Sequence, residues 1–285
     1  MAAPVLPLLL GLAAAAAARQ DTEHGDRGGG APPLCRPRGG VVFVDECGDG
    51  FKATDSAGQP DHTAVLQAAL NVSGAHTVVL RNLSASTPWV ATPLFLYRND
   101  MTFRFEPNAF LHAKRGRACR AAGAETCFHG RDDSMLRVAA ARNVSIVGGP
   151  GSTIRMWKVD YLNYTEYMKA EWRMGIYLGH ELNNESAFAE CQDMTIKGVS
   201  IEQSGGDGIY IDNCERVLIQ DVNSDGNSRQ GLSIIGAKHL LVERSNFSNT
   251  NGTAPAAGID IEPDGVYFDL VNITIRDCWA VSKYQ

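Results

Sequence analysis

Carboxyl groups occur in two of three short strings of the chain that share one pattern. The strings GIYIDN (208–213), GLSIIG (231–236) and GIDIEP (258–263) each begin with a glycine and then alternate apolar and variable positions. If the isoleucines point inward from short strands, the intervening side chains Asp212, Asp260 and Glu262 point outward on one face. Most glycoside hydrolases use two carboxyl groups, which flank the scissile bond, as their catalytic pair. We predict Asp212, paired with Asp260 or Glu262, as catalytic acids that cleave a glycosidic bond.

Further polar residues surround this pair in the sequence. Asp207 directly precedes GIYIDN, Arg229 and Gln230 directly precede GLSIIG, and Asp264 follows Pro263. Crowded carboxyl groups raise the pKa of at least one member, which is a common property of catalytic sites. We expect substrate contacts from Asp207, Tyr210, Arg229, Gln230, Arg173, Tyr177 and Trp172.

A repeat of about 23 residues must position these groups. Strings that follow the glycine strings align on Ile196, Ile219, Val242 and Ile275, at intervals of 23, 23 and 33 residues. Each unit holds three strands too short to bury an apolar face alone, so successive units must stack. Short alternating strands also occur in β-sandwiches, but the constant interval favours a solenoid. We predict an all-β fold, a right-handed parallel β-helix with coils about 4.8 Å apart.

Stacking in register would place the outward residues in two ladders. One ladder contains Tyr177, Tyr210, Ser233 and Asp260, and the second contains Gly179, Asp212, Ile235 and Glu262. Asp212 and Glu262 are then two coils apart, which is roughly 9–10 Å. That separation is near the upper limit of the ~6.5–9.5 Å range of inverting glycosidases.

The ends of the chain differ from the repeat. Residues 1–19 form an apolar run with a small-residue end, typical of a signal peptide, and the Gly- and Pro-rich residues 20–40 predict a flexible arm. The β-helix domain then spans 41–285, with an amphipathic helix over Asp61–Leu70, N-capped by Asp61, covering its first coil. Trp279 is followed only by AVSKYQ, with no capping element, which predicts a truncated C-terminal end.

The opening GDGFKATDSAGQPDHTAVLQAAL (48–70), together with the repeat, resembles the pectate-lyase-like superfamily over about 41–281. The resemblance implies an exported β-helix related to polygalacturonases and polysaccharide lyases. Of the three polygalacturonase signatures, the N-T-D motif falls on Gly205-Gly206-Asp207, the Asp-Asp pair on Arg229-Gln230 and G-H-G near Ala256-Ala257-Gly258. Because Asp207 alone matches, hydrolysis would use Asp212 with Asp260 or Glu262.

Two alternatives to hydrolysis remain open from the sequence. In a calcium-dependent lyase, carboxylates would hold Ca²⁺ through oxygen ligands, and Arg229 would act as base or clamp, the role that an arginine has in pectate lyases. In a non-catalytic protein, the long rigid face would bind carbohydrate or serve a structural role. We favour an enzyme, and expect calcium only if the protein is a lyase.

Two other segments are candidates for sugar contacts. Residues 155–177 interrupt the repeat and are rich in Trp and Tyr, whose faces stack on pyranose rings; we expect one wall of the groove here, with Arg173 pointing into it. His180, at a strand end, is a possible acid or ligand. The loop 112–133 is basic and would contact an acidic polysaccharide or solvent.

Several features predict an exported glycoprotein. We expect disulfides Cys191–Cys214, whose members are 23 residues apart, Cys119–Cys127 and Cys35–Cys47, which leaves Cys278 as a buried structural thiol. The net charge of −6 argues against nucleic-acid binding. The expected partner is a glycan, and we expect a secreted monomer with no membrane association after signal cleavage. N-glycosylation sequons start at Asn71, Asn82, Asn143, Asn163, Asn184, Asn246, Asn251 and Asn272.

Overall fold

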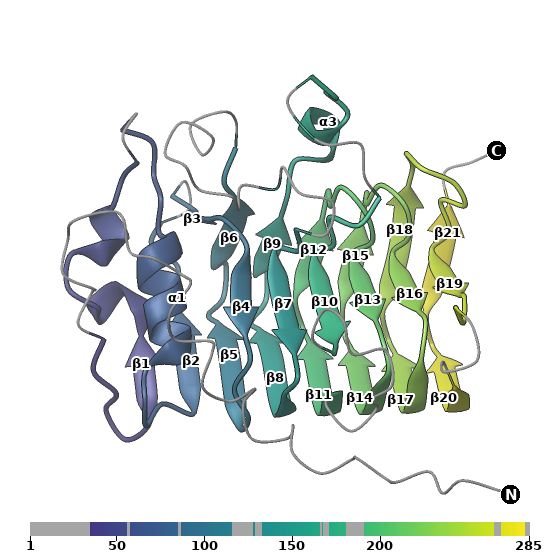
Figure 1. Cartoon of the computed structure of the whole chain (residues 1–285), viewed down its shortest axis with the longest axis horizontal. Coiled ribbons are helices and arrows are strands. Elements are labelled where there is room, and N and C mark those ends of the chain that lie inside the picture. Colours follow the sequence, from purple (N-terminus) through teal and green to yellow (C-terminus); the bar gives the residue numbers. More distant parts are fainter. Residues whose placement is uncertain are drawn as a thin grey trace, which may run out of the picture. The chain divides into compact units, whose positions relative to one another are not determined.

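The computed structural model describes residues 35–55, 58–84, 87–115, 128, 133–165, 167, 171–180, 191–264 and 269–282. These residues form three parallel sheets whose strands follow one another around successive coils (Figure 1). The predicted signal peptide, most of the predicted arm and the Cys119–Cys127 pair lie outside the described residues. Within the described part, no helix is long and apolar enough to cross a membrane.

Each sheet contributes one strand to a coil. The eight-stranded sheet contains β1 (Val41–Phe43), β2 (Thr77–Leu80), β5 (Met101–Phe105), β8 (Arg142–Gly148), β11 (Cys191–Lys197), β14 (Cys214–Gln220), β17 (Ala237–Glu243) and β20 (Leu270–Arg276). The seven-stranded sheet contains β3 (Trp89–Ala91), β6 (Phe110–Ala113), β9 (Thr153–Arg155), β12 (Ser200–Glu202), β15 (Asn223–Asp225), β18 (Asn246–Thr250) and β21 (Trp279–Ser282). The six-stranded sheet contains β4 (Leu94–Leu96), β7 (Leu136–Ala139), β10 (Ile176–Gly179), β13 (Ile209–Ile211), β16 (Leu232–Ile234) and β19 (Ile259–Ile261).

The register confirms the predicted repeat. Ile196, Ile219, Val242 and Ile275 are successive partners in the eight-stranded sheet. The inward residues Ile209, Leu232 and Ile219 are fully buried, so stacking builds one continuous apolar column. The fold is therefore the predicted parallel β-helix, in which residues 23 apart become neighbours.

In the eight-stranded sheet, one equivalent position departs from ordinary strand geometry in five neighbouring strands. Five successive strands have a residue with positive φ near their start, and the sheet pairing passes over each of these residues without a change of register. Asn and Asp adopt this conformation more readily than other L-residues, and three of the five are of these types. The five residues are Asn143, Asp193, Arg216, His239 and Asn272.

The predicted helix covers the first coil, although its start differs from the prediction. α1 spans Thr63–Asn71 with His62 as N-cap, two residues later than expected, because Asp61 precedes the cap and accepts hydrogen bonds from Thr63. Its side chains bond to unpaired strand edges: Gln67 exchanges two hydrogen bonds with the backbone of Phe95 in β4. A free strand edge is thereby satisfied by a helix.

Three short helical elements complete the described part of the fold. Two 3-10 helices, η1 (Val44–Glu46) and η2 (Gly50–Lys52), precede α1, and α3 (Lys158–Tyr161) projects between β9 and β10 (Figure 1). The structure contains the expected disulfides Cys191–Cys214 and Cys35–Cys47. Cys278 is a free thiol in the expected register, but it is half-buried rather than buried, because it lies in the last described coil.

Candidate functional site

The outer face of the six-stranded sheet carries the predicted ladder in register. Tyr177, Tyr210, Ser233 and Asp260 are successive partners, and Arg137 of β7 precedes them. The rings of Tyr177 and Tyr210 are stacked with centroids 5.8 Å apart, and the Arg137 guanidinium lies 3.8 Å from the Tyr177 centroid. Sequence reasoning missed Arg137 because the repeat fades upstream, although LRVA (136–139) has the same inward alternation.

Asp212 sits beside this aromatic column, just beyond the end of β13. Its Oδ2 accepts a hydrogen bond of 2.9 Å from the Tyr177 hydroxyl and lies 3.4 Å from Nδ1 of His180. Its Oδ1 is buried and has no hydrogen-bond partner among the described residues. Burial raises the pKa of Asp212, against the opposing effects of His180, Tyr177 and Arg137.

Asp207 is the centre of a second polar cluster. Its side chain is fully buried; Oδ1 accepts from the Gln230 backbone N–H at 3.0 Å and Oδ2 accepts from the Ser233 hydroxyl at 2.9 Å. Arg229 lies 3.5 Å from Oδ2. Burial raises the pKa of Asp207 to about 7, although Arg229 and both hydrogen bonds oppose the rise. Asp207 is therefore not a surface group; it holds its neighbours in place from the interior, and we call it the buried support.

Two residues connect this buried support to acids nearer the surface. Arg229 donates to Glu262 at 2.8 Å, and the Gln230 amide donates to Asp260 at 2.9 Å. Burial lowers the pKa of Arg229, but Asp207, Glu262 and Glu171 together raise it further, so the net shift is upward. The Glu262 side chain is 42% exposed, so it can be reached from solvent while Arg229 holds its orientation.

The predicted catalytic pair therefore divides between two clusters. Backbone hydrogen bonds continue the register past the strand ends, from Asp212 to Leu178, Ile235 to Ile211 and Glu262 to Ile234. One rung, that of Ile235, lies between Asp212 and Glu262, so the two stand about 9–10 Å apart. Asp264 is a further acid near Asp212, whose pKa its charge helps to raise.

Arg173 requires a correction. It was expected to face the groove, but its side chain is fully buried. Its Nε donates to the Phe128 carbonyl at 2.5 Å, and its guanidinium lies 5.4 and 5.8 Å from the ring centroids of Tyr161 and Tyr167. It clamps the segment that joins β9 to β10 and cannot contact a substrate in this arrangement.

The aromatic segment is mostly packing rather than an exposed wall. Tyr161, Tyr167 and Tyr177 are buried, while Trp157 and Trp172 are half-buried and Tyr164 is exposed. Of the predicted substrate contacts, Gln230 is also buried and Tyr210 is half-buried. Tyr210 is thus the member of the aromatic ladder most available to a ligand.

The residues present do not fit the calcium that a lyase would need. Among the described residues, no group of three or more His, Cys, Asp or Glu side chains is arranged to hold a metal ion. The carboxyl groups of the site are instead hydrogen-bonded to Tyr177, Arg229 and Gln230. We derive no step through calcium.

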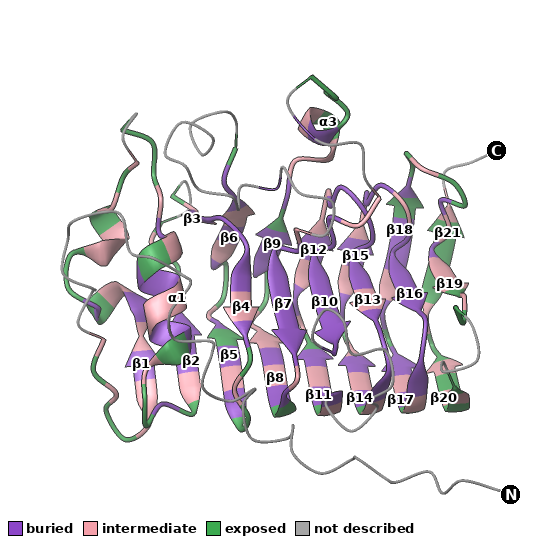
Figure 2. Cartoon of the chain, in the orientation of Figure 1, coloured by how far each residue is buried: buried purple, intermediate pink, exposed green. Residues whose placement is uncertain are grey.

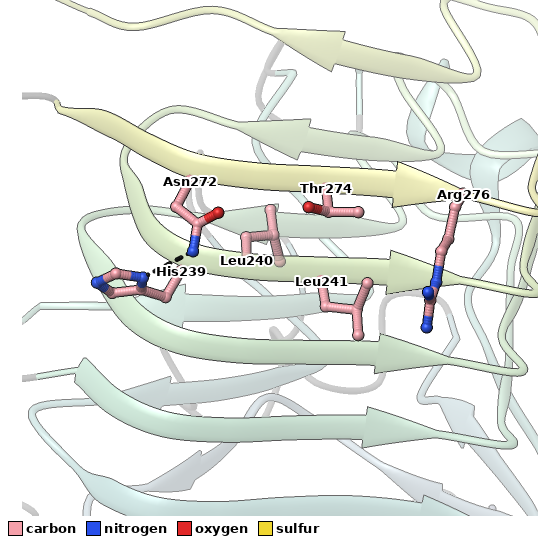
Figure 3. A pocket seen from close by; sticks show the side chains of 6 residues that line it. All are labelled: His239, Leu240, Leu241, Asn272, Thr274 and Arg276. Atoms are coloured by element: carbon pink, nitrogen blue, oxygen red, sulfur yellow. Dashed lines mark hydrogen bonds between the residues drawn. The ribbon is translucent and has the colours of Figure 1, made fainter.

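A hollow on a different face lacks the chemistry of this site. It has a volume of about 280 Å³ on the outer side of β17 and β20 (Figure 3). Side chains of His239 and Asn272 lie at one end, 2.9 Å apart, and Arg276 lies at the other (Figure 3). None of its lining residues carries a carboxyl group; they are His239, Leu240, Leu241, Asn272, Thr274 and Arg276.

The predicted sequons are mostly at the surface. Asn184 lies outside the described residues, Asn246 is half-buried, and the remaining six are exposed. Exposure is what glycan attachment requires, and whether the sites are occupied stays a prediction. The exposed six are Asn71, Asn82, Asn143, Asn163, Asn251 and Asn272.

Comparisons with known proteins agree with the architecture. Residues 177–284 match the family model described as right handed beta helix region. The uncharacterized protein YclG of Bacillus subtilis (strain 168) is 29% identical over 121 residues, which cover 36% of this chain and 21% of YclG.

Two solved structures are similar in fold. Iota-carrageenase complexed to iota-carrageenan fragments has a TM-score of 0.54 and 14% identity, covering 86% of this chain and 49% of that one. A protein of Parabacteroides merdae, provisionally assigned as a glycosyl hydrolase, has a TM-score of 0.51 and 13% identity, covering 85% of this chain and 96% of that one. This chain thus spans about half of the carrageenase and about a fifth of YclG. By its own three sheets and by these comparisons, the chain is a right-handed parallel β-helix protein, similar in fold to polysaccharide-degrading enzymes.

Proposed function

We propose that this protein hydrolyses a polysaccharide on the outer face of its six-stranded sheet. The observation that carries the proposal is a pair of carboxyl groups in opposite environments. Burial favours the protonated form of Asp212, whereas Glu262 is exposed and ion-paired with Arg229. Such a division of environments is how glycosidases keep one acid and one base at the same pH.

The geometry suits an inverting mechanism. Asp212 would donate a proton to the glycosidic oxygen as the bond to the anomeric carbon breaks. Glu262 would remove one proton from a water whose oxygen bonds to that carbon from the opposite side. A spacing of about 9–10 Å leaves room for the sugar and the water. The Tyr177 hydroxyl bond and His180 would stabilise the Asp212 carboxylate that results.

Other residues have supporting roles in this proposal. Asp207 orients Arg229 and Gln230, which hold Glu262 and Asp260. Tyr210, with one ring face stacked on Tyr177, would contact a pyranose. Asp260 lies two residues before Glu262 in the same coil and is the alternative base.

Comparisons and composition support the broader class. The similar carrageenase was solved with fragments of its polysaccharide, which makes a glycan partner the first to test here. The apolar N-terminal run, the sequons and the disulfides support an exported protein. A protein that binds no nucleic acid fits the net charge of −6, and a monomer stays a prediction.

A lyase that uses Arg229 as its base has less support. Arg229 is in ion pairs with Asp207, Glu262 and Glu171, and its pKa is raised. A base must first lose its proton, and these three acids favour the charged guanidinium.

The test is incubation of the purified protein with a panel of neutral, carboxylated and sulfated polysaccharides. We expect new reducing ends without an unsaturated product absorbing near 235 nm. Absorbance at that wavelength would indicate a lyase instead. Binding to a polysaccharide without any new reducing ends would contradict the proposal and favour a non-catalytic carbohydrate-binding protein.

A further inference from the structure

A basic hollow lies where the seven-stranded sheet turns toward the six-stranded sheet. Its volume is about 230 Å³, and it is formed by residues around the end of β9 and the start of α3. Three cations line it, with a single acid, an indole and an amide: Arg115, Arg155, Lys158, Asp160, Trp157 and Gln203. The hollow combines the start of the basic loop with the start of the aromatic segment, and none of its lining residues belongs to the hydrolytic site.

The single acid in this hollow is already neutralised. Asp160 accepts two hydrogen bonds from Arg115, through its Nε and Nη2. Arg115 in turn lies over the Trp157 ring, 4.7 Å from its centroid, so this face of the indole is covered. The Lys158 ammonium donates to the Asn251 carbonyl at 3.0 Å. Because Asp160 is paired with Arg115, the charge of Arg155 gives the hollow an excess of positive charge.

Arg155 is the cation best placed to receive a ligand. It is exposed and ends β9, and its side chain forms no hydrogen bond or ion pair within the part of the chain that the structure describes. Its neighbours on the ladder are His112 on one side and Glu202 on the other. Burial raises the pKa of Glu202 although the charge of Arg155 opposes the rise, and burial together with Arg155 lowers the pKa of His112. Neither neighbour forms an ion pair that would occupy the guanidinium.

We propose that this hollow binds an oxyanion carried by a sugar unit, a carboxylate or a sulfate, with Arg155 as its main contact. Guanidinium groups bind both oxyanions through two parallel N–H bonds. A volume of about 230 Å³ is below the ~300–1,000 Å³ of ordinary ligand pockets, which fits one charged substituent better than a whole sugar chain. This inference rests on the proposed function and narrows its substrate class to acidic polysaccharides.

The hollow is connected to the candidate site through the same coils. Gln203 lies four residues before the buried Asp207. Lys158 also reaches the carbonyl of Asn227, 3.4 Å away and two residues before Arg229. A glycan lying across the six-stranded sheet could therefore place an acidic substituent in the hollow while an adjoining sugar contacts Tyr210.

The test is a set of binding titrations by calorimetry. Three matched galactan-type hexasaccharides serve as probes: one neutral, one carboxylated (oligogalacturonate) and one sulfated. Each is titrated into the Asp212→Asn chain, so that turnover does not interfere, and into the same chain with Arg155→Gln added. Arg104→Gln, an exposed arginine of β5 in the eight-stranded sheet, is the matched control.

We expect at least one acidic probe to bind about tenfold or more tightly than the neutral one, since bonds to charged groups are the strong ones. Arg155→Gln should remove that preference and leave neutral binding and the melting temperature unchanged, and Arg104→Gln should change nothing. Which acidic probe binds identifies carboxylate or sulfate.

Equal binding of acidic and neutral probes, no binding of either acidic probe, or full affinity in Arg155→Gln would overturn the inference. Its failure can be told from that of the proposed function. Arg155-dependent binding with no product from the unmodified chain would sink hydrolysis alone. Product release with no preference for acidic probes would sink this inference alone.

Discussion

The outer faces of the six-stranded and eight-stranded sheets are both polar, but they differ in burial. On the six-stranded face Arg137, Tyr177 and Ser233 are buried, and Figure 2 shows β7, β10 and β16 largely in the buried colour. On the eight-stranded face the polar residues form exposed ion pairs, such as Arg216 with Asp193 at 2.6 Å. Polarity alone therefore does not mark the functional face.

The electrostatic consequences of this difference are opposite. Exposed pairs are screened by water and contribute little to stability, and on that face Arg216 lowers the pKa of Asp193. Burial on the six-stranded face raises the pKa values of Asp207 and Asp212. Only the second situation favours the protonated form of a carboxyl group, which a general acid requires.

The largest expected effect is on catalysis. Asp212→Asn or Glu262→Gln should lower turnover about a thousandfold, because each variant removes a proton-transfer group. Asp193→Asn and Glu215→Gln make the same changes on the eight-stranded sheet and should leave the rate unchanged. Initial rates of reducing-end formation measure the effect of each variant. Equal losses of turnover in the variants of both sheets would contradict the assignment of catalysis to the six-stranded face.

The next effect is on stability. Asp207→Ala should cost about 3–5 kcal/mol, because it leaves Arg229 without its buried partner. Urea unfolding of this variant and of Asp193→Ala measures the contrast, and we expect no resolvable loss for Asp193→Ala. If Asp207→Ala lowers the free energy of unfolding no more than Asp193→Ala does, the buried cluster around Asp207 does not stabilise the fold.

Asp207 also gives the unfolding free energy a pH dependence of known sign. Its pKa is raised from 3.8 to about 7, so the folded chain binds a proton more tightly than the unfolded chain. The resulting stabilisation is fully present below about pH 4 and is lost as the pH rises through 7, up to about 4 kcal/mol. Asp207→Asn should lack this decline, which urea titrations at pH 4, 6 and 8 would reveal; parallel curves for both proteins would contradict it.

The disulfide Cys191–Cys214 joins neighbouring coils at the start of β11 and β14. Replacing both cysteines with alanine should lower the free energy of unfolding by about 3 kcal/mol, since the bond closes a loop of about 23 residues in the unfolded chain. Turnover should persist below the melting temperature, because neither sulfur contacts a carboxyl group of the acids; Cys214 Sγ lies 3.8 Å from the backbone carbonyl of Asp212. Loss of activity in the folded variant would show that the two sheets are coupled.

The smallest effect concerns Tyr177. Its hydroxyl lowers the pKa of Asp212 by bonding to the carboxylate, so Tyr177→Phe should raise that pKa further. If Asp212 is the acid, activity declines as the pH rises through its pKa, and the variant's decline should move to higher pH. The pH profile of kcat/KM measures this, and movement to lower pH would exclude Asp212 as the acid.

The repeat could be predicted because, in a solenoid, residues that are one repeat apart in the sequence become neighbours in adjacent coils. The interval of 23 residues was sufficient to place Tyr210 beside Ser233 and Cys191 beside Cys214. Alternation within strands also placed Asp212 outside the core. What the residues do to one another depends on rotamers and burial, so the division of Asp212 and Glu262 between separate clusters was not visible.

Irregular segments were predicted less well for the same physical reason. Arg173 lies just before β10, where no alternation fixes side-chain direction, and it turned inward among tyrosines. The start of α1 moved because the Asp61 side chain can accept from Thr63 without being the cap. Arg137 was missed where the repeat is too degenerate to align.

The central claim is that a glycan binds across the six-stranded face between the two acids. A crystal structure of the Asp212→Asn variant with a bound oligosaccharide tests it most directly. We predict a sugar ring against Tyr210, with its glycosidic oxygen near position 212 and a water near Glu262. An oligosaccharide bound solely on the eight-stranded face, with Tyr210 and Glu262 uncontacted, would contradict the account.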